Sequence, residues 1–109
     1  MKGKIMKSTT KDTFKADVLE SKKIVLLDVW APWCAPCRGM EPIVEALSED
    51  TKAFAEVIKL NAESEMEIVQ ELGVTGLPTF LVFKNGKIVG STIGATSKMN
   101  LLKLISAAA

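Results

Sequence analysis

The pattern of apolar and polar residues predicts five β-strands. Apolar residues run with little interruption from Ile24 to Trp30, which is typical of a strand buried on both faces of a parallel sheet. Thr79–Lys84 and Lys87–Ile93 are two strands joined by Asn85-Gly86, a dipeptide that strongly favours a tight hairpin. Two more strands are expected, a short edge strand at Ile5–Lys7 and a strand at Glu56–Asn61.

Four helices are expected around these strands. Apolar residues at helical spacing give one helix, from about Cys34 to Leu47, a single apolar side, and Pro42 inside it should kink it. The apolar residues concerned are Met40, Ile43, Val44 and Leu47. The other helices run from an N-cap at Thr10 to about Glu20 with Phe14 and Val18 on one face, from Glu65 to Leu72 with Gly73 ending the helix, and from a Ser97 cap through Leu101, Leu102, Leu104 and Ile105.

The order of these elements is βαβαβαββα, which places the chain in the α/β class. The first three strands are each followed by a helix, so they favour parallel pairing, whereas the hairpin must be antiparallel. We therefore expect a mixed five-stranded sheet flanked by four helices, with helices on both faces. The 109 residues suffice for one hydrophobic core, so residues 1–109 are expected to form a single domain.

Composition and charge narrow the possible partners. Apolar residues make up 48% of the chain and charged residues 25%, with a formal net charge of +1 and no basic stripe or acidic tail. We expect neither a nucleic-acid nor a membrane partner, and a monomer. The longest unbroken apolar run, Ile24–Leu27, is far shorter than a membrane span, and no signal-peptide region follows the basic start. A cytoplasmic location is expected.

Two counts restrict the chemistry further. The chain has no histidine, which excludes imidazole catalysis and histidine-ligated metal. It has only two cysteines, too few for a four-cysteine zinc site within one chain. No metal is expected.

The two cysteines, Cys34 and Cys37, lie three residues apart where a strand gives way to a helix. This spacing is nearly one helical turn, so both sulfurs can face the same side and bond. Cys34 falls at the helix N-terminus, where free N–H groups and the helix dipole stabilise a thiolate, and Pro36 suits the first turn. Cys34 should therefore be the exposed, reactive thiol and Cys37 the sheltered one. The alternatives are two small core residues or half of a metal site.

Several segments together resemble the thioredoxin family. Residues 27–38, Leu-Asp-Val-Trp-Ala-Pro-Trp-Cys-Ala-Pro-Cys-Arg, are similar to its active-site segment. Gly76-Leu77-Pro78-Thr79, Phe83-Lys84-Asn85-Gly86 and Ile93-Gly94-Ala95 match three further signatures in the expected order. The resemblance extends from about Ile5 to Ile105. The chain departs from the family at Ala35, where glycine is usual, and at Val29, where phenylalanine is frequent.

The resemblance implies that Cys34 is the nucleophile, that Cys37 is the resolving thiol, and that Asp28 is a buried acid behind the pair. Burial would raise the pKa of Asp28, so that it exchanges protons with Cys37. Alternatively, Asp28 reaches water at a strand end or is held by Lys59. Lys59 is similar to the family's modulating lysine, although it would equally suit a snorkelling surface position.

The resemblance also implies a cis peptide between Leu77 and Pro78, with Pro78 facing the dithiol, although Pro78 would also suit the start of an edge strand. Gly94 would leave room for a substrate chain that pairs near Leu77, or it is only a bulge. The expected substrate-binding residues are Trp33, Ala35, Pro36, Val74, Thr75, Leu77, Ile93, Gly94 and Ala95. Trp30 is expected in the core.

The activity implied is protein-disulfide reduction by thiol–disulfide exchange, in which the chain acts as a general electron donor for cell redox homeostasis. The substrates would be disulfide-containing proteins, and a flavoprotein, a thioredoxin reductase, would restore the dithiol. No bound cofactor is expected besides the redox-active Cys34–Cys37 disulfide. The alternatives are a thiol oxidase or isomerase, which usually carries a histidine between the cysteines, and a non-catalytic subunit that clamps a larger partner.

Overall fold

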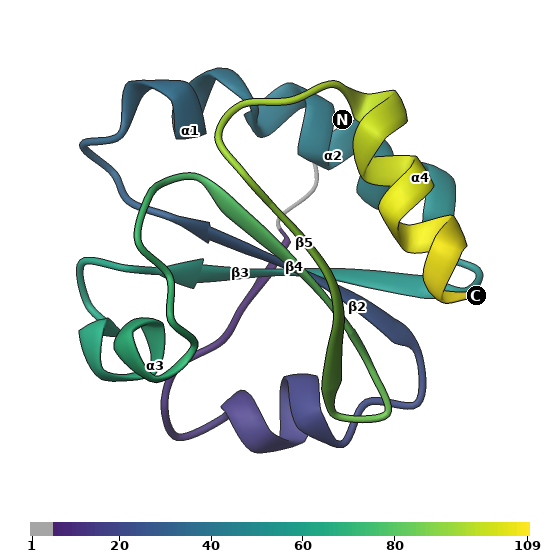
Figure 1. Ribbon diagram of the computed structural model, residues 1–109, viewed down its shortest axis with the longest axis horizontal. Helices are drawn as coiled ribbons and strands as arrows, with labels where there is room; N and C mark the ends of the chain where they lie inside the picture. The colour runs from purple at the N-terminus through teal and green to yellow at the C-terminus, as the bar shows by residue number, and fades with distance from the viewer. Residues whose placement is uncertain (1–5) are drawn as a thin grey trace.

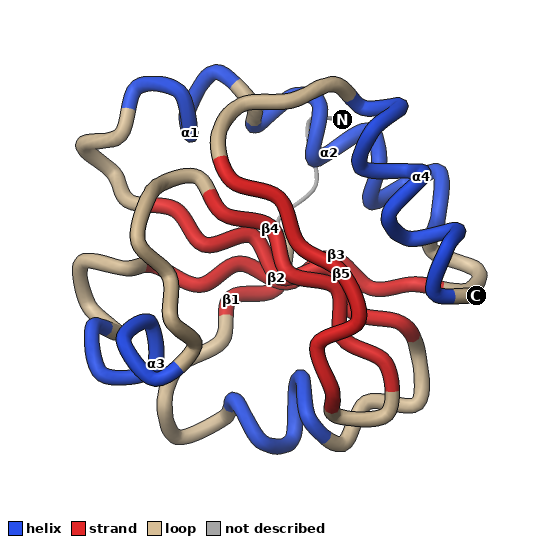
Figure 2. The backbone as a smooth tube through the Cα atoms, viewed as in Figure 1, coloured by secondary structure: helices blue, strands red, loops and turns tan. Residues whose placement is uncertain are grey.

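The computed structural model describes residues 6–109 (Figure 1). Its centre is a five-stranded sheet in the order β1-β3-β2-β4-β5, drawn red in Figure 2. The strands are β1 (Lys7–Ser8), β2 (Ile24–Trp30), β3 (Ala55–Asn61), β4 (Thr79–Lys84) and β5 (Lys87–Ile93). β3 pairs parallel with β1 and β2, whereas β4 pairs antiparallel with β2 and β5. The mixed sheet is therefore confirmed, with β1 at its edge; Ile5 of the expected edge strand lies outside the described residues.

The helices form one layer on each face of the sheet. Above it in Figure 1 lie α1 (Ala35–Gly39), α2 (Glu41–Thr51) and α4 (Lys98–Ala108), and below it lie the π-helical turn η1 (Lys15–Leu19) and α3 (Met66–Glu71). Side chains alternate along β2, so Leu26 packs in the core with α2 and α4, and Leu27 packs in the core with η1 and α3. Asp28, the next residue, therefore belongs to the α2 face.

The helix expected from Cys34 to Leu47 is in fact two helices, α1 and α2, so the structure has five helices rather than four. The break falls at Met40, two residues before Pro42, whose missing N–H interrupts the hydrogen-bond ladder. The Met40 N–H still bonds the carbonyl of Pro36, and Val44 N–H bonds the carbonyl of Met40. The α2 helix also extends past Leu47 to Thr51, whose hydroxyl donates to the Leu47 carbonyl at 2.9 Å.

The first helix is also shorter than expected, and its predicted N-cap was wrong. A turn precedes the helix, and in it the Thr13 hydroxyl accepts a hydrogen bond from Thr10 N–H. The helical turn η1 begins only at Lys15, and no side chain caps it. The helical turn η1 then closes with a wide bond from Glu20 N–H to the Lys15 carbonyl, at 2.9 Å. Phe14 and Val18 do share the face that packs on the sheet, as predicted.

The remaining connections follow their turn residues. Ser97 caps α4 by accepting a hydrogen bond from Asn100 N–H, and Gly73 follows α3 with a positive φ of 74°. Gly86 closes the β4–β5 hairpin at φ 79°, and a Cβ added there would lie 2.9 Å from the carbonyl oxygen of Leu19, so glycine is required twice over. Within residues 6–109, no helix has the length and apolar character needed to cross a membrane.

Candidate active site

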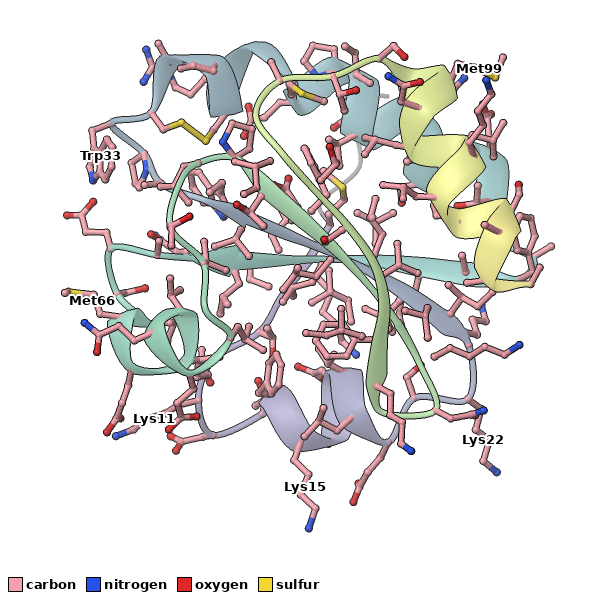
Figure 3. All side chains as sticks on the ribbon, viewed as in Figure 1. Lys11, Lys15, Lys22, Trp33, Met66 and Met99 are labelled. Carbon is pink, nitrogen blue, oxygen red and sulfur yellow. A yellow bond between two sulfur atoms is a disulfide. The ribbon has the colours of Figure 1, made fainter. Side chains whose placement is uncertain are left out.

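The two cysteines lie where the chain passes from the end of β2 into α1, in the helical layer above the sheet. Cys34 is the N-cap of α1, with Pro36 in the first turn, and the backbone N–H of Cys37 donates to the Cys34 sulfur at 3.3 Å. Their Cα atoms are 5.3 Å apart and their sulfurs form a disulfide, visible as the yellow bond beside Trp33 in Figure 3. The structure thus brings together the pair that the sequence predicts and shows it in the oxidised state.

The two sulfur-bearing residues are equally buried, contrary to the expectation that Cys34 is the exposed one. Each is only 6% exposed in the disulfide form, because the pair is buried with Ala31, and Trp30 and Leu77 pack against this cluster. They differ in which surface they reach. Cys34 lines an open groove and Cys37 does not. A partner can therefore approach Cys34 through this groove.

The groove has a volume of about 500 Å³ and runs between the start of α1, the end of β3, α3 and the segment before β4. Its lining residues are Trp33, Cys34, Ala35, Pro36, Ala62, Val69, Val74, Thr75, Gly76 and Leu77. Trp33 stands at its rim, 67% exposed, and its ring points away from the body of the protein in Figure 3. Six of the predicted substrate-binding residues line this groove.

Sequence reasoning missed three of the lining residues, Ala62, Val69 and Gly76. Ala62 directly follows β3, and its N–H donates to the Trp30 carbonyl at 2.7 Å. The carboxyl ends of two neighbouring parallel strands lie at the same end of the sheet. The strand order therefore predicts that Ala62, after β3, lies near the cysteine segment that follows β2. Gly76 lies between Thr75 and Leu77, which were both predicted to bind substrate, so its place in the sequence could have indicated that it also lines the groove.

The predicted residues Ile93, Gly94 and Ala95 lie outside the groove. Ile93 is 63% exposed and pairs with Thr79, and Gly94 N–H donates to the Pro78 carbonyl at 2.7 Å. The peptide between Leu77 and Pro78 is cis, and β4 is an inner strand, so Pro78 does not begin an edge strand. The hairpin irregularity falls at Val82/Phe83 rather than at Gly94.

Asp28 is buried, which excludes the alternative of a carboxylate reaching water. Only 5% of it is exposed, and burial raises its pKa from the usual 3.8 to about 6. The positive charge of Lys59 acts in the opposite direction, and the negative charge of Glu41 adds to the rise. A carboxyl group that titrates near neutral pH can both accept and donate a proton under ordinary conditions.

Lys59 is neither a snorkelling surface residue nor an ion-pair partner of Asp28. It is 8% exposed, its ammonium nitrogen lies 3.1 Å from Glu41 Oε2, and the same nitrogen stands 4.2 Å from the centroid of the Trp30 ring. Glu41 was not predicted as part of the site, because its role depends on how α2 packs over β3. Trp30 is only half-buried.

Residues 6–109 contain no group of three or more histidine, cysteine, aspartate or glutamate residues placed to hold a metal ion. The site holds a cysteine pair as a disulfide, and β2, the strand that leads to it, carries the buried carboxyl group of Asp28. A neighbouring dithiol can exchange two electrons with another disulfide by thiol–disulfide exchange.

Comparisons with known proteins agree with this geometry. The family profile described as Thioredoxin matches residues 5–107. The chain is 41% identical over 99 residues to "Thioredoxin" of Streptomyces clavuligerus, covering 91% of this chain and 92% of the relative. It is 38% identical over 103 residues to "Thioredoxin" of Chlorobaculum thiosulfatiphilum, covering 94% of each. The profile, the relatives and the cysteine pair lead to one conclusion: the chain belongs to the thioredoxin family of protein-disulfide oxidoreductases.

Proposed function

We propose that Cys34 is the nucleophile and Cys37 the resolving thiol in the reduction of protein disulfides by this chain. The observation that carries the assignment is the position of the two residues relative to the groove, since Cys34 lines it and Cys37 lies behind it. Two further features support it. Cys34 is the N-cap of α1, and the Cys37 N–H is directed at its sulfur, both of which stabilise a thiolate at that position.

The reaction has two exchange steps. The Cys34 thiolate attacks one sulfur of the substrate disulfide, a mixed disulfide forms, and the other substrate sulfur leaves as a thiolate that takes a proton. Cys37 then loses its proton and attacks the Cys34 sulfur, which releases the second substrate thiol. The substrate gains two electrons and two protons, and Cys34 and Cys37 become the disulfide seen in the structure.

Asp28 is the proposed acceptor of the Cys37 proton in the second step. Its support is burial on the sheet face that α2 covers, together with a pKa of about 6, which leaves most of the carboxyl group ionised at neutral pH. In the reverse direction, when the disulfide is reduced, protonated Asp28 returns the proton to the leaving Cys37 thiolate. Lys59 modulates this transfer through its charge.

Substrate binding is assigned to the groove and its rim. The exposed Trp33 ring and the apolar groove wall suit a chain segment that carries a disulfide. Pro78 is proposed to face the dithiol. Beside the groove, Leu77 offers backbone for pairing with an extended substrate, and Ile93, Gly94 and Ala95 form the neighbouring surface. Ala35 and Pro36 complete the wall nearest the nucleophile.

Turnover requires an external electron source, because each cycle leaves the chain oxidised. We assign this role to a flavoprotein, a thioredoxin reductase, with the chain itself carrying no bound cofactor. A cytoplasmic location and a monomeric state accord with a general reductase in a thiol-reducing compartment.

The test is reduction of insulin disulfides by the wild-type chain and by Cys34→Ser and Cys37→Ser, with a thioredoxin reductase and a nicotinamide reductant as the electron supply. Turnover by the wild type and its loss in both variants are expected. Turnover with dithiothreitol but not with the reductase would overturn the assigned electron donor alone. Full activity of the Cys34→Ser variant would overturn the proposed mechanism.

A further inference from the structure

The ammonium group of Lys59 pairs with Glu41 and not with Asp28, the acid that it would be expected to neutralise. Lys59 and Asp28 are register partners on adjacent parallel strands and belong to the same face of the sheet. Yet within residues 6–109 no ion pair joins them, and the Lys59 nitrogen instead lies 3.1 Å from Glu41 Oε2. The Lys59 side chain is 10% exposed and the Glu41 side chain 51%, so Glu41 anchors a buried cation from the solvent side.

We propose that Glu41 is a positioning residue for the dithiol chemistry, whose carboxylate holds the Lys59 ammonium over the Trp30 ring and so keeps this cation out of contact with Asp28. The inference rests on the proton-transfer role proposed for Asp28. It assigns the regulation of that group to a residue on α2 that does not line the groove.

The surroundings of Lys59 leave it room to move once Glu41 releases it. A cavity of about 450 Å³ lies beside the ammonium group, and its charged lining residues are Arg38, Glu41, Glu45 and Lys59. Arg38, the other cation, is bonded through its guanidinium to the Pro32 carbonyl at 2.8 Å. Lysine has a flexible four-carbon stem, so its ammonium can turn within such a space. Arg38 is held and cannot readily replace it.

Among residues 6–109, the charges that act on the pKa of Asp28 are those of Lys59 and Glu41. On β4 the register partner of Asp28 is Phe80, and the α4 residues packed in this core, Leu101 and Ile105, are apolar. The charged residues that line the cavity beside Lys59 are Arg38 on α1, Glu41 and Glu45 on α2, and Lys59 itself.

Neutralising Glu41 should change the pKa of Asp28 in two ways, and both lower it. It removes a negative charge that raises the pKa of Asp28. It also frees Lys59 to approach Asp28, and a closer cation favours the ionised carboxylate. Both effects lower the pKa of Asp28, so the carboxylate form should persist to more acidic pH.

The experiment is a pH titration of the Asp28 carboxyl carbon by NMR in the oxidised protein, where the cysteines are a disulfide and do not titrate. In Glu41→Gln, the Asp28 midpoint should fall by roughly 0.5–1 pH unit relative to the wild type. Glu45→Gln is the matched control, since it makes the same charge change one turn further along α2 on the same cavity. Its shift should be less than half as large. An unchanged or raised midpoint in Glu41→Gln overturns the proposal, as does an equal shift in the control.

A second comparison separates positioning from simple charge. In a Lys59→Met background, Glu41→Gln has no cation to release, so its effect on the Asp28 midpoint should be less than half of its effect with Lys59 present. Equal effects in the two backgrounds would mean that Glu41 acts only as a nearby charge, which overturns the positioning role. The titration does not depend on activity. A failure of Asp28 as the proton acceptor would appear instead as an unchanged reduction rate in Asp28→Asn.

Discussion

The backbone N–H of Cys37 lies 3.3 Å from the sulfur of Cys34 and donates to it, so the residue proposed as the resolving thiol also supports the proposed nucleophile. This bond belongs to the first turn of α1 and does not require the side chain of Cys37. It should therefore persist when the Cys37 sulfur is removed.

From this relationship we expect Cys37→Ser to trap substrates as stable mixed disulfides through Cys34. The Cys34→Ser variant should trap little, because Cys37 does not line the groove. Non-reducing gels and intact-mass analysis after incubation with a disulfide-containing protein measure the adducts. Predominant trapping by Cys34→Ser would reverse the assigned roles.

The burial of Asp28 predicts a gain in stability for Asp28→Asn. In the wild type the folded-state pKa is raised to about 6 from the usual 3.8, so the folded state holds the proton more tightly. The stability that this provides is complete below the unfolded-state pKa and is lost as pH rises through about 6. Relative to the wild type, the free energy of unfolding of Asp28→Asn should therefore rise by about 2–3 kcal/mol between about pH 4 and pH 7. Urea denaturation at both pH values measures it, and a constant difference between the two proteins would contradict the raised pKa.

The proton transfer itself should be visible in the resolution step. Asp28 must be ionised to accept the Cys37 proton, so the rate of this step should increase as pH rises through about 6. In Asp28→Asn the step should be slower and should lose this increase. Stopped-flow measurement of substrate-thiol release under single-turnover conditions tests both points. A rate independent of Asp28 would remove the carboxyl group from the mechanism.

Ala35 occupies the first position of α1, where a helical backbone suits alanine better than glycine. Ala35→Gly should lower the free energy of unfolding by about 0.4–1 kcal/mol. Both redox states keep the start of the helix, so the loss should be nearly equal in the two, and the two-electron potential should shift by less than roughly 30 mV. Thermal melts and a redox titration against glutathione measure the two quantities. A larger potential shift would show that Ala35 distorts one redox state.

Trp33 should matter for substrates and not for folding, because its side chain is exposed at the rim of the groove. Trp33→Ala should lower kcat/KM for a protein disulfide by about 5- to 30-fold, which corresponds to loss of about 1–2 kcal/mol of contact. The midpoint of thermal unfolding should change little. Met66→Ala, at an exposed residue outside the groove, is the matched control. Equal effects of the two substitutions would mean that the rim does not select substrates.

Local signals were sufficient for most of the strands and for the cysteine pair. The unbroken apolar run that ends at Trp30 and the Asn85-Gly86 turn each specify their own geometry, and β2, β4 and β5 have the predicted bounds. The division of the second helix at Met40 was only partly foreseen, because a proline predicts a kink without deciding whether the helix continues. No sequence pattern predicted that η1 would be π-helical, with the Glu20 N–H bonded to the Lys15 carbonyl five residues earlier.

The charges around the site were harder to predict than the cysteines. Lys59 and Glu41 are 18 residues apart and meet only because α2 packs over β3. No local sequence pattern indicates that Lys59 pairs with Glu41 on α2 and not with Asp28 on the neighbouring strand. The groove shows the same limit, since Val69 joins its wall through the packing of α3.

The pairing of β2 with β3 has a consequence for how the chain avoids misfolding. Side chains alternate along a strand, so a slip of one residue would turn Asp28 into the opposite core, which holds Val18, Ile58 and Ile68 from the neighbouring elements. There the carboxyl group would meet an apolar environment without the cation on its partner strand, which is strongly unfavourable. The residue that destabilises the native strand thus destabilises its slipped competitors more. The buried acid that is proposed to accept the Cys37 proton therefore also marks the correct alignment of the sheet.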